Sequence, residues 1–278
     1  MVQSIAENMQ SHSDGSQAQD NTSTMQQPPR ASTPQGVPAK EYSSSELPAP
    51  ELVDRLVKAY FSRFHLFCPI LVRGSFLASI ANKSVSLPLL RSVLFVGSIH
   101  CDMETIHLLG YNSRFSANSD LMVRAVAVFD TDKRSDRTSM FLSSYLLHYW
   151  FGNPSVYRDS HWWFAAAVRS AQCMGYHLST WHTQMPATER SRWKRVWWCL
   201  YIRDRQISLS TGTPMVINDA DFDVEELVPE DIPDEDPETV RYLIGQMSLN
   251  MTGIRMPIPY PLQADRPLRA GIANFLHL

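Results

Sequence analysis

The sequence lacks closely spaced cysteines and any strong excess of one charge. Its four cysteines, Cys68, Cys101, Cys173 and Cys199, lie far apart among 278 residues, and none forms a CxxC pair. This spacing excludes a zinc cluster made of cysteines alone and disfavours a disulfide framework. The formal net charge is −3, from 25 Lys and Arg against 28 Asp and Glu. A basic coat for nucleic acid is therefore excluded, whereas a local basic patch is not.

Long apolar runs and the short motifs of common catalytic sites are also missing. No window approaches twenty uninterrupted apolar residues, and the first residues do not resemble a signal peptide, so we expect a soluble intracellular protein without a membrane segment. GxGxxG, GxSxG, HExxH and the phosphate-loop motif are absent, and we expect no enzyme activity. His100 and His107 are too far apart for a tight zinc clamp. A calcium loop starting at Asp219 fails because Val224 occupies its glycine position.

Composition divides the chain into three segments. Residues 1–48 are rich in Ser, Gln, Pro and Thr, and they contain too few large apolar side chains to offset the entropy of ordering, which predicts a disordered tail. Residues 49–252 carry the apolar periodicity of helices and are predicted to form one helical domain. Residues 253–278 begin with a proline-rich stretch and are predicted to form an irregular C-terminal tail.

Apolar residues at three- and four-residue spacing predict an all-α fold of antiparallel, stacked helices. The predicted helices cover residues 52–68, 76–80, 88–101, 119–129, 138–150, 160–175, 188–210 and 240–251. Ser160 and Thr188 are predicted N-caps. Gly175 is predicted to end one helix, and Gly212 with Pro214 another.

Residues 189–205 interleave six basic side chains with aromatic ones. One interpretation is nucleic-acid binding by charge and stacking. We favour a buried helix, because Trp193, Trp197 and Leu200 share one helical face and burial would leave few aromatic surfaces free. The arginines would then pair with acidic residues or stack on indoles. Asp204 lies among apolar neighbours and is expected to be buried and paired.

Eleven acidic residues crowd positions 219–238, where three prolines interrupt the chain. The pattern predicts a solvated acidic loop, with nearby arginines as candidate partners. Because Gly212 and Pro214 force a turn, we expect this loop to fold back along the preceding basic helix.

Two stretches in this order resemble the middle homology region of fungal zinc-cluster transcription factors. One is a small-residue helix that ends in a Gly-x-His turn, and the other is a basic, Trp-Trp helix with Asp-Arg, a Gly-x-Pro turn and acidic positions. The residues that carry the resemblance are Trp162, Trp163, Gly175, Arg192, Trp193, Arg195, Trp197, Trp198, Asp204, Arg205, Gly212, Pro214, Asp219 and Asp221. The resemblance covers about residues 50–250. The chain departs from it at Tyr176, where Leu is common, at Thr213, where a basic residue is common, and in lacking the six-cysteine zinc cluster.

The resemblance implies a nuclear regulator of fungal transcription that controls a metabolic or secondary-metabolite gene cluster. Its expected partners are other transcription regulators or a second copy, DNA only indirectly or through a domain missing here, and a small-molecule inducer. No cofactor is expected, because the zinc ligands of the family are absent.

The alternative is a small-molecule-sensing or protein-interaction module, including a truncated regulator, with no direct promoter role. In that case, Trp162, Trp163, Trp197, Trp198 and Tyr201 could line a pocket. We favour core packing for these rings, because large aromatic side chains dominate ordinary protein cores.

Overall fold

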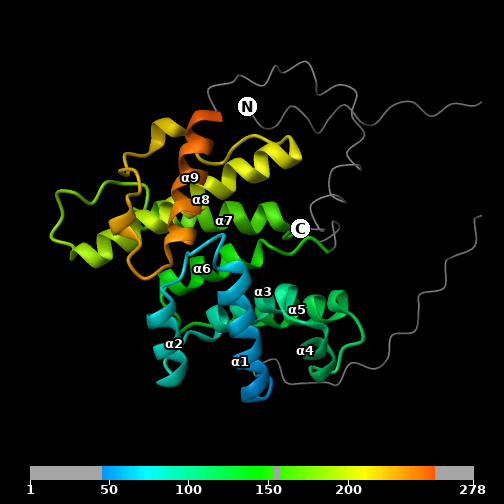
Figure 1. Cartoon of the computed structure of the whole chain (residues 1–278). Coiled ribbons are helices and arrows are strands. Elements are labelled where there is room, and N and C mark those ends of the chain that lie inside the picture. Colours follow the sequence, from blue (N-terminus) through cyan, green and yellow to red (C-terminus); the bar gives the residue numbers. More distant parts are fainter. Residues whose placement is uncertain (1–45, 153–156, 254–278) are drawn as a thin grey trace, which may run out of the picture. The chain divides into compact units, whose positions relative to one another are not determined.

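A computed structural model describes residues 46–152 and 157–253, and within them the chain is helical with no β-strand (Figure 1). This confirms the predicted all-α fold. Most of the two predicted tails, 1–48 and 253–278, lies outside the described residues. No described helix is both long and apolar enough to cross a membrane.

The elements are α1 (Pro50–Ala59), η1 (Tyr60–Phe64), α2 (Arg73–Ala81), α3 (Leu87–His100), α4 (Met103–Leu108), α5 (Arg114–Thr131), α6 (Arg137–Leu147), α7 (Ser160–Cys173), α8 (Ala187–Thr211), η2 (Asp219–Asp221), η3 (Pro229–Asp231) and α9 (Pro237–Gly253). Two of the connections between the α-helices contain helical turns: η1 lies between α1 and α2, and both η2 and η3 lie between α8 and α9. Every long helix lies in a region where the apolar spacing predicts one.

Helix starts depend on capping side chains, and two predicted caps are wrong. Asp159, not Ser160, caps α7, because its carboxylate accepts the N–H of Trp162 at 2.8 Å. In α8, Pro186 occupies the cap position instead of Thr188 and no side chain caps the helix. Helix α4 was not predicted, because six residues are too few to show a periodic apolar stripe.

The predicted helix over 52–68 is shorter and changes its winding. Helix α1 ends at Ala59, and Tyr60–Phe64 form the π-helical turn η1, which the His65 N–H closes onto the Tyr60 carbonyl at 2.9 Å. Tyr60, Phe61 and Phe64 are all buried. The turn therefore directs three aromatic side chains into the core before the chain leaves the helix.

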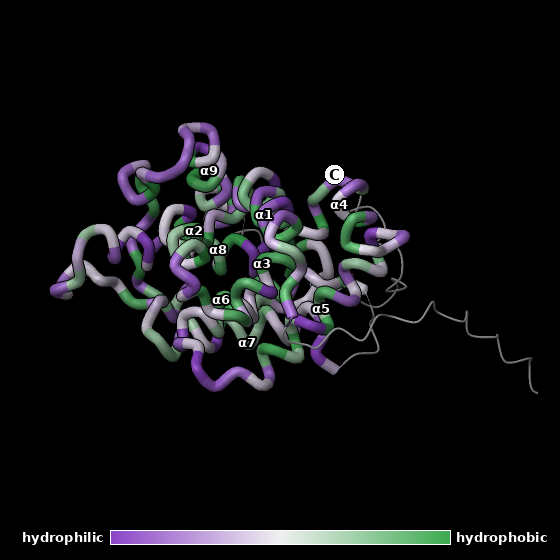
Figure 2. Tube along the Cα trace, turned by 90° about the horizontal axis from the view of Figure 1, so that it is seen from below, coloured by the Kyte–Doolittle hydropathy of each residue, from purple (hydrophilic) through white to green (hydrophobic). Residues whose placement is uncertain are grey.

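Helix α3 packs against α1, α5 and α6 (Figure 1). Helix α6 also packs against α7, and α8 packs against α9. The α1–α3 contact requires Gly97, since a Cβ there would lie 2.3 Å from the carbonyl oxygen of Leu56. The hydropathy view shows hydrophilic residues gathered in connections such as the one beside α9 (Figure 2).

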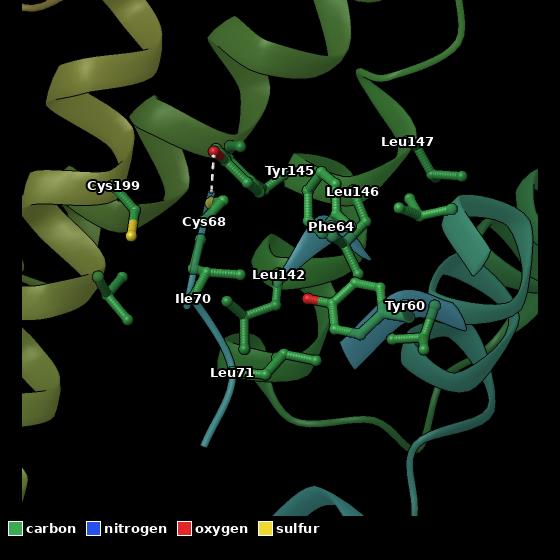
Figure 3. Packing of buried hydrophobic residues seen from close by; sticks show 14 of the residues in the cluster. Tyr60, Phe64, Cys68, Ile70, Leu71, Leu142, Tyr145, Leu146, Leu147 and Cys199 are labelled. Atoms are coloured by element: carbon green, nitrogen blue, oxygen red, sulfur yellow. Dashed lines mark hydrogen bonds between the residues drawn. The ribbon is translucent and has the colours of Figure 1, made fainter. Parts of the chain in front are cut away.

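One continuous core joins the early and late helices. Figure 3 shows Tyr60 and Phe64 packed with Leu142 and Leu146 of α6. Beside them, the Tyr145 hydroxyl and the Cys68 thiol lie 3.0 Å apart and share a buried hydrogen bond. The same core includes buried residues of α7 and α8, and α8 carries half of the candidate site residues.

Candidate functional site

Helix α8 is buried on all sides along its middle. Residues 195–202 are all buried, although this stretch includes a charged Arg195. A helix that is buried all round belongs to the centre of a fold rather than to its surface. This agrees with the prediction of a buried helix and leaves little aromatic surface for stacking nucleic-acid bases.

The Asp204 network consists of Asp204, Arg205, Asp219 and Tyr201. Asp204 is 1% exposed, and its carboxylate accepts the backbone N–H groups of Val216 at 3.0 Å and Ile217 at 2.9 Å. Its Oδ2 also accepts the guanidinium of Arg205 at 2.8 Å. Burial raises the pKa of Asp204, while the two amides and Arg205 act in the opposite direction. The predicted burial and pairing of Asp204 are both confirmed.

Arg205 extends this network to the start of the acidic loop. It donates to the carbonyl of Ile217 at 2.8 Å and to the carboxylate of Asp219, which also accepts the Tyr201 hydroxyl at 3.0 Å. The guanidinium lies 3.8 Å from the centre of the Tyr201 ring. Gly212, with a φ of 70°, ends α8 and lets the chain return along it, as predicted. The network therefore fastens the returning loop to the helix.

The turn after α7 is bonded to α8 by Trp193. Gly175 has a φ of 88°, and the bonds from Gly175 to Gln172 and from Tyr176 to Ala171 form a Schellman cap. The Trp193 indole donates to the carbonyl of Gly175 at 3.2 Å and stacks on Tyr176 at 3.8 Å between ring centroids. The predicted role of Gly175 as a helix stop is confirmed.

The acidic loop is anchored rather than fully solvated, which corrects the sequence prediction. Asp231 is buried and pairs with Lys194 at 2.5 Å, and Arg195 contacts Asp234 at 3.4 Å. The Glu235 carboxylate lies 2.7 Å from the buried His65. Lys194 and Arg195 of α8 thus pair with acids of the loop, which agrees with the part of the prediction that named nearby arginines as partners.

Trp198 adds a further bond between α8 and the loop, because its indole donates to the carbonyl of Glu225 at 2.8 Å. Trp163 and Trp197 are buried in the core. Arg192 is partly exposed and contacts Glu189 at 3.3 Å. Pro214 and Asp221 are exposed.

Sequence reasoning missed a half-buried polar contact between α8 and His148, the residue that follows α6. Arg203 donates to the imidazole of His148 at 2.8 Å and lies over the Tyr149 ring at 4.5 Å. Burial and the Arg203 charge hold the pKa of His148 well below its ordinary value, so the ring is neutral and can accept this bond. No spacing rule relates residues 55 positions apart, so this contact could not be predicted from the sequence.

A cleft of about 380 Å³ lies between α6 and α7, and we name it the α6–α7 cleft. Its apolar lining includes Phe129, Met140 and Trp162, and the exposed Arg137 and Arg169 also line it. Of the five rings considered for a pocket, Trp162 belongs to this cleft, and the other four are buried. The sequence did not point to the cleft, because its residues come from three separate helices.

Comparison with known proteins places these features in one family. A sequence model described as "Fungal specific transcription factor domain" matches residues 57–275. Cutinase transcription factor 1 beta of Fusarium vanettenii is 32% identical over 190 residues, which are 66% of this chain and 22% of that protein.

Two further relatives match this chain with similar identities and over a similar share of its length. The acetamidase regulatory protein of Aspergillus fumigatus is 30% identical over 191 residues, 66% of this chain and 24% of its own length. The fusaric acid cluster transcription factor FUB12 of Gibberella moniliformis is 28% identical over 192 residues, 66% of this chain and 29% of that protein. The chain therefore spans less than a third of the length of these relatives. No solved structure gives a significant match.

Proposed function

Because this chain belongs to the fungal-specific transcription factor domain family, we propose that it is a helical regulatory domain that controls transcription in the nucleus through contacts with other proteins. The family match over residues 57–275 carries the proposal. The family and these relatives are transcription factors, not enzymes. The relatives' names refer to cutinase, acetamidase and a fusaric acid cluster, which supports metabolic or secondary-metabolite genes as the targets.

Protein contacts, rather than direct DNA contacts, are supported by the state of the basic side chains on α8. Lys194, Arg195 and Arg205 each pair with a carboxylate, and Arg203 bonds to His148. Cations that are already paired offer little to a phosphate backbone, whose binding depends on free Lys and Arg. In this proposal the domain reaches DNA through a partner or through a separate DNA-binding domain.

Deleting the gene in its host tests the proposal. Under inducing conditions, we expect a set of metabolic gene transcripts to change together, and the wild-type gene should restore them. A matched pair of rescue genes tests whether the folded domain is needed. Asp221→Ala, at an exposed position, should restore the transcripts, whereas Asp204→Ala, which removes a buried carboxylate, should not. Unchanged transcripts after deletion would contradict the proposal.

Gel retardation with purified chain 1–278 tests the indirect contact with DNA. We expect no sequence-selective binding of duplex DNA at physiological salt, because Lys194, Arg195 and Arg205 of α8 are paired with carboxylates and the net charge is −3. Tight retardation of one promoter sequence but not of a scrambled one would contradict this expectation.

Small-molecule sensing is a second candidate function. The α6–α7 cleft favours it, because its volume of about 380 Å³ falls within the range of small-molecule sites.

A further inference from the structure

We propose that the α6–α7 cleft binds a small organic carboxylate, with the carboxylate at Arg137 and Arg169 and the apolar part against Phe129, Met140 and Trp162. A role of this site in regulating transcription rests on the proposed function. Binding itself is a property of the purified chain, so the two proposals can fail separately.

The lining of the cleft fits a compact, largely apolar molecule. Phe129 comes from α5, Met140 from α6 and Trp162 from α7, and all three are partly exposed where they line the cleft. Small-molecule sites are mostly apolar concave surfaces with a few polar groups that fix orientation. A volume of about 380 Å³ accommodates such a molecule and is too small for a folded partner.

The charges of the cleft select an anion. Arg137 and Arg169 are exposed, and within the described residues neither makes an ion pair or a side-chain hydrogen bond. A guanidinium presents donors in a planar fork that matches a carboxylate. Two such groups in one cleft of this size therefore favour a carboxylate over a neutral ligand.

Two acids that precede Arg137 in the sequence are already engaged. Asp130 accepts two bonds of 2.6 Å from Arg158, and Asp136 caps α6 through the N–H of Ser139 at 2.9 Å. Neither forms an ion pair with Arg137 or Arg169. A carboxylate bound at these arginines therefore comes from outside the described part of the chain.

The walls of the cleft are held in place without a ligand. The Arg158 guanidinium, fixed by Asp130, lies 5.6 Å from the ring centre of Trp162. Ser144 also lines the cleft, and its hydroxyl donates to the carbonyl of Trp163 at 2.9 Å, which bonds α6 to α7. A site with fixed walls loses less conformational entropy when a ligand binds.

Cys173 provides a reporter for occupancy. It lines the cleft and is exposed, whereas Cys68, Cys101 and Cys199 are buried. Alkylation of the native chain by iodoacetamide, with the modified residue identified by mass spectrometry, should therefore occur at Cys173. A molecule in the cleft should slow this reaction by covering the thiol.

The test uses 3-phenylpropionate as the probe and the neutral 3-phenylpropionamide as its matched control. At about twice its Kd, the carboxylate should slow alkylation of Cys173 about threefold, because only free protein reacts. The amide should give much weaker protection at the same concentration. Equal protection by acid and amide, or no protection by the acid up to its solubility limit, would overturn the proposal.

Variants locate the effect in the cleft. Arg169→Gln and Arg137→Gln should each raise the Kd for the carboxylate, read from the protection of Cys173, about tenfold, because each removes a charge-assisted contact. Arg63→Gln removes an exposed arginine of η1 outside the cleft. In this variant, 3-phenylpropionate should protect Cys173 as strongly as in the wild type. Loss of protection in Arg63→Gln would overturn the assignment, as would protection by a Glu-rich peptide but not by the small acid.

Discussion

The Asp204 network and the α6–α7 cleft use arginine in opposite ways. Arg205 is 1% exposed, and its guanidinium donates to Asp204, Asp219 and the carbonyl of Ile217. Arg137 and Arg169 are exposed and make no ion pair in the described part of the chain. A buried charge without partners is costly, whereas an exposed charge keeps its hydration. Pairing is therefore obligatory in the network and unnecessary in the cleft.

The contrast separates residues that maintain the fold from residues that are free to bind. The motif positions that carry the resemblance are mostly of the first kind: Trp163, Trp197 and Trp198 are buried, and Asp204 is fully bonded. Arg137 and Arg169 are not among those positions, although Arg169 lies on α7, the helix of the first stretch. Most of the recognisable motif positions in this domain thus maintain the fold, and Trp162 is the motif position that also lines the cleft.

Removing the Asp204 carboxylate should have the largest effect on stability. Asp204→Ala leaves Arg205 buried with one carboxylate fewer and two amides without acceptors, so we expect a loss of about 3–5 kcal/mol in the free energy of unfolding. Urea denaturation followed by circular dichroism measures it. Asp221→Ala is the control, at an exposed position where a change within about 0.5 kcal/mol is expected. A loss below about 1 kcal/mol for Asp204→Ala would mean that the network behaves like a surface ion pair.

Two glycine substitutions should change stability in opposite directions. Gly175→Ala places a side chain at a φ of 88° and should cost about 1–2 kcal/mol, because alanine disfavours the left-handed region. Gly245→Ala, in α9 with nothing within 4 Å of the new Cβ, should stabilise the chain by about 0.5–1 kcal/mol. Thermal unfolding of the two variants beside the wild type compares them. Equal shifts would show that the turn onto Trp193 imposes no backbone constraint.

The double variant Arg137→Gln/Arg169→Gln should leave the free energy of unfolding within about 0.5 kcal/mol of the wild type, because neither side chain is buried or paired. The same denaturation experiment measures this variant beside Asp204→Ala. Destabilisation above about 1 kcal/mol would erase the contrast between the cleft and the network, because it would give the cleft arginines a structural role.

The smallest expected effect is the loss of the ion pair between Arg158 and Asp130 at acid pH. The hydrogen bonds and charge of Arg158 lower the pKa of Asp130 below its ordinary value. The resulting stabilisation is present above the unfolded-state pKa of about 3.9 and disappears as the pH falls through the lower folded-state pKa. Because the Asp130 side chain is 43% exposed, we expect less than about 1 kcal/mol. Wild type and Arg158→Gln should differ at pH 7 and converge at strongly acid pH; a constant difference would contradict this.

Local patterns predicted the long helices and several of their ends. Gly175 and Gly212 have the positive φ values that their positions after a helix suggested. Asp204 is buried and paired because a carboxylate among apolar neighbours requires partners. The short α4 could have been found from Asp102, whose carboxylate accepts the Thr105 N–H at 2.7 Å.

Contacts between distant segments could not be predicted in the same way. The acidic loop looked solvated because charge runs usually are, yet Asp231 is buried against Lys194. His65 and Glu235 meet across 170 positions of sequence. Which acid becomes buried depends on which cation the folded helices place beside it, and a one-dimensional pattern contains no such information.

The sequence by itself determined the all-α class, the approximate helix positions, the glycine stops and the need of Asp204 for partners, because all of these follow from periodicity, backbone freedom and the cost of burying charge. Tertiary structure alone decided which acids of the loop are buried and where a cleft remains. Phe129, Arg137 and Arg169 belong to three different helices and form one site only because α5, α6 and α7 pack together. Such a site depends on the distances between helices, and these are set by the packing of the whole core.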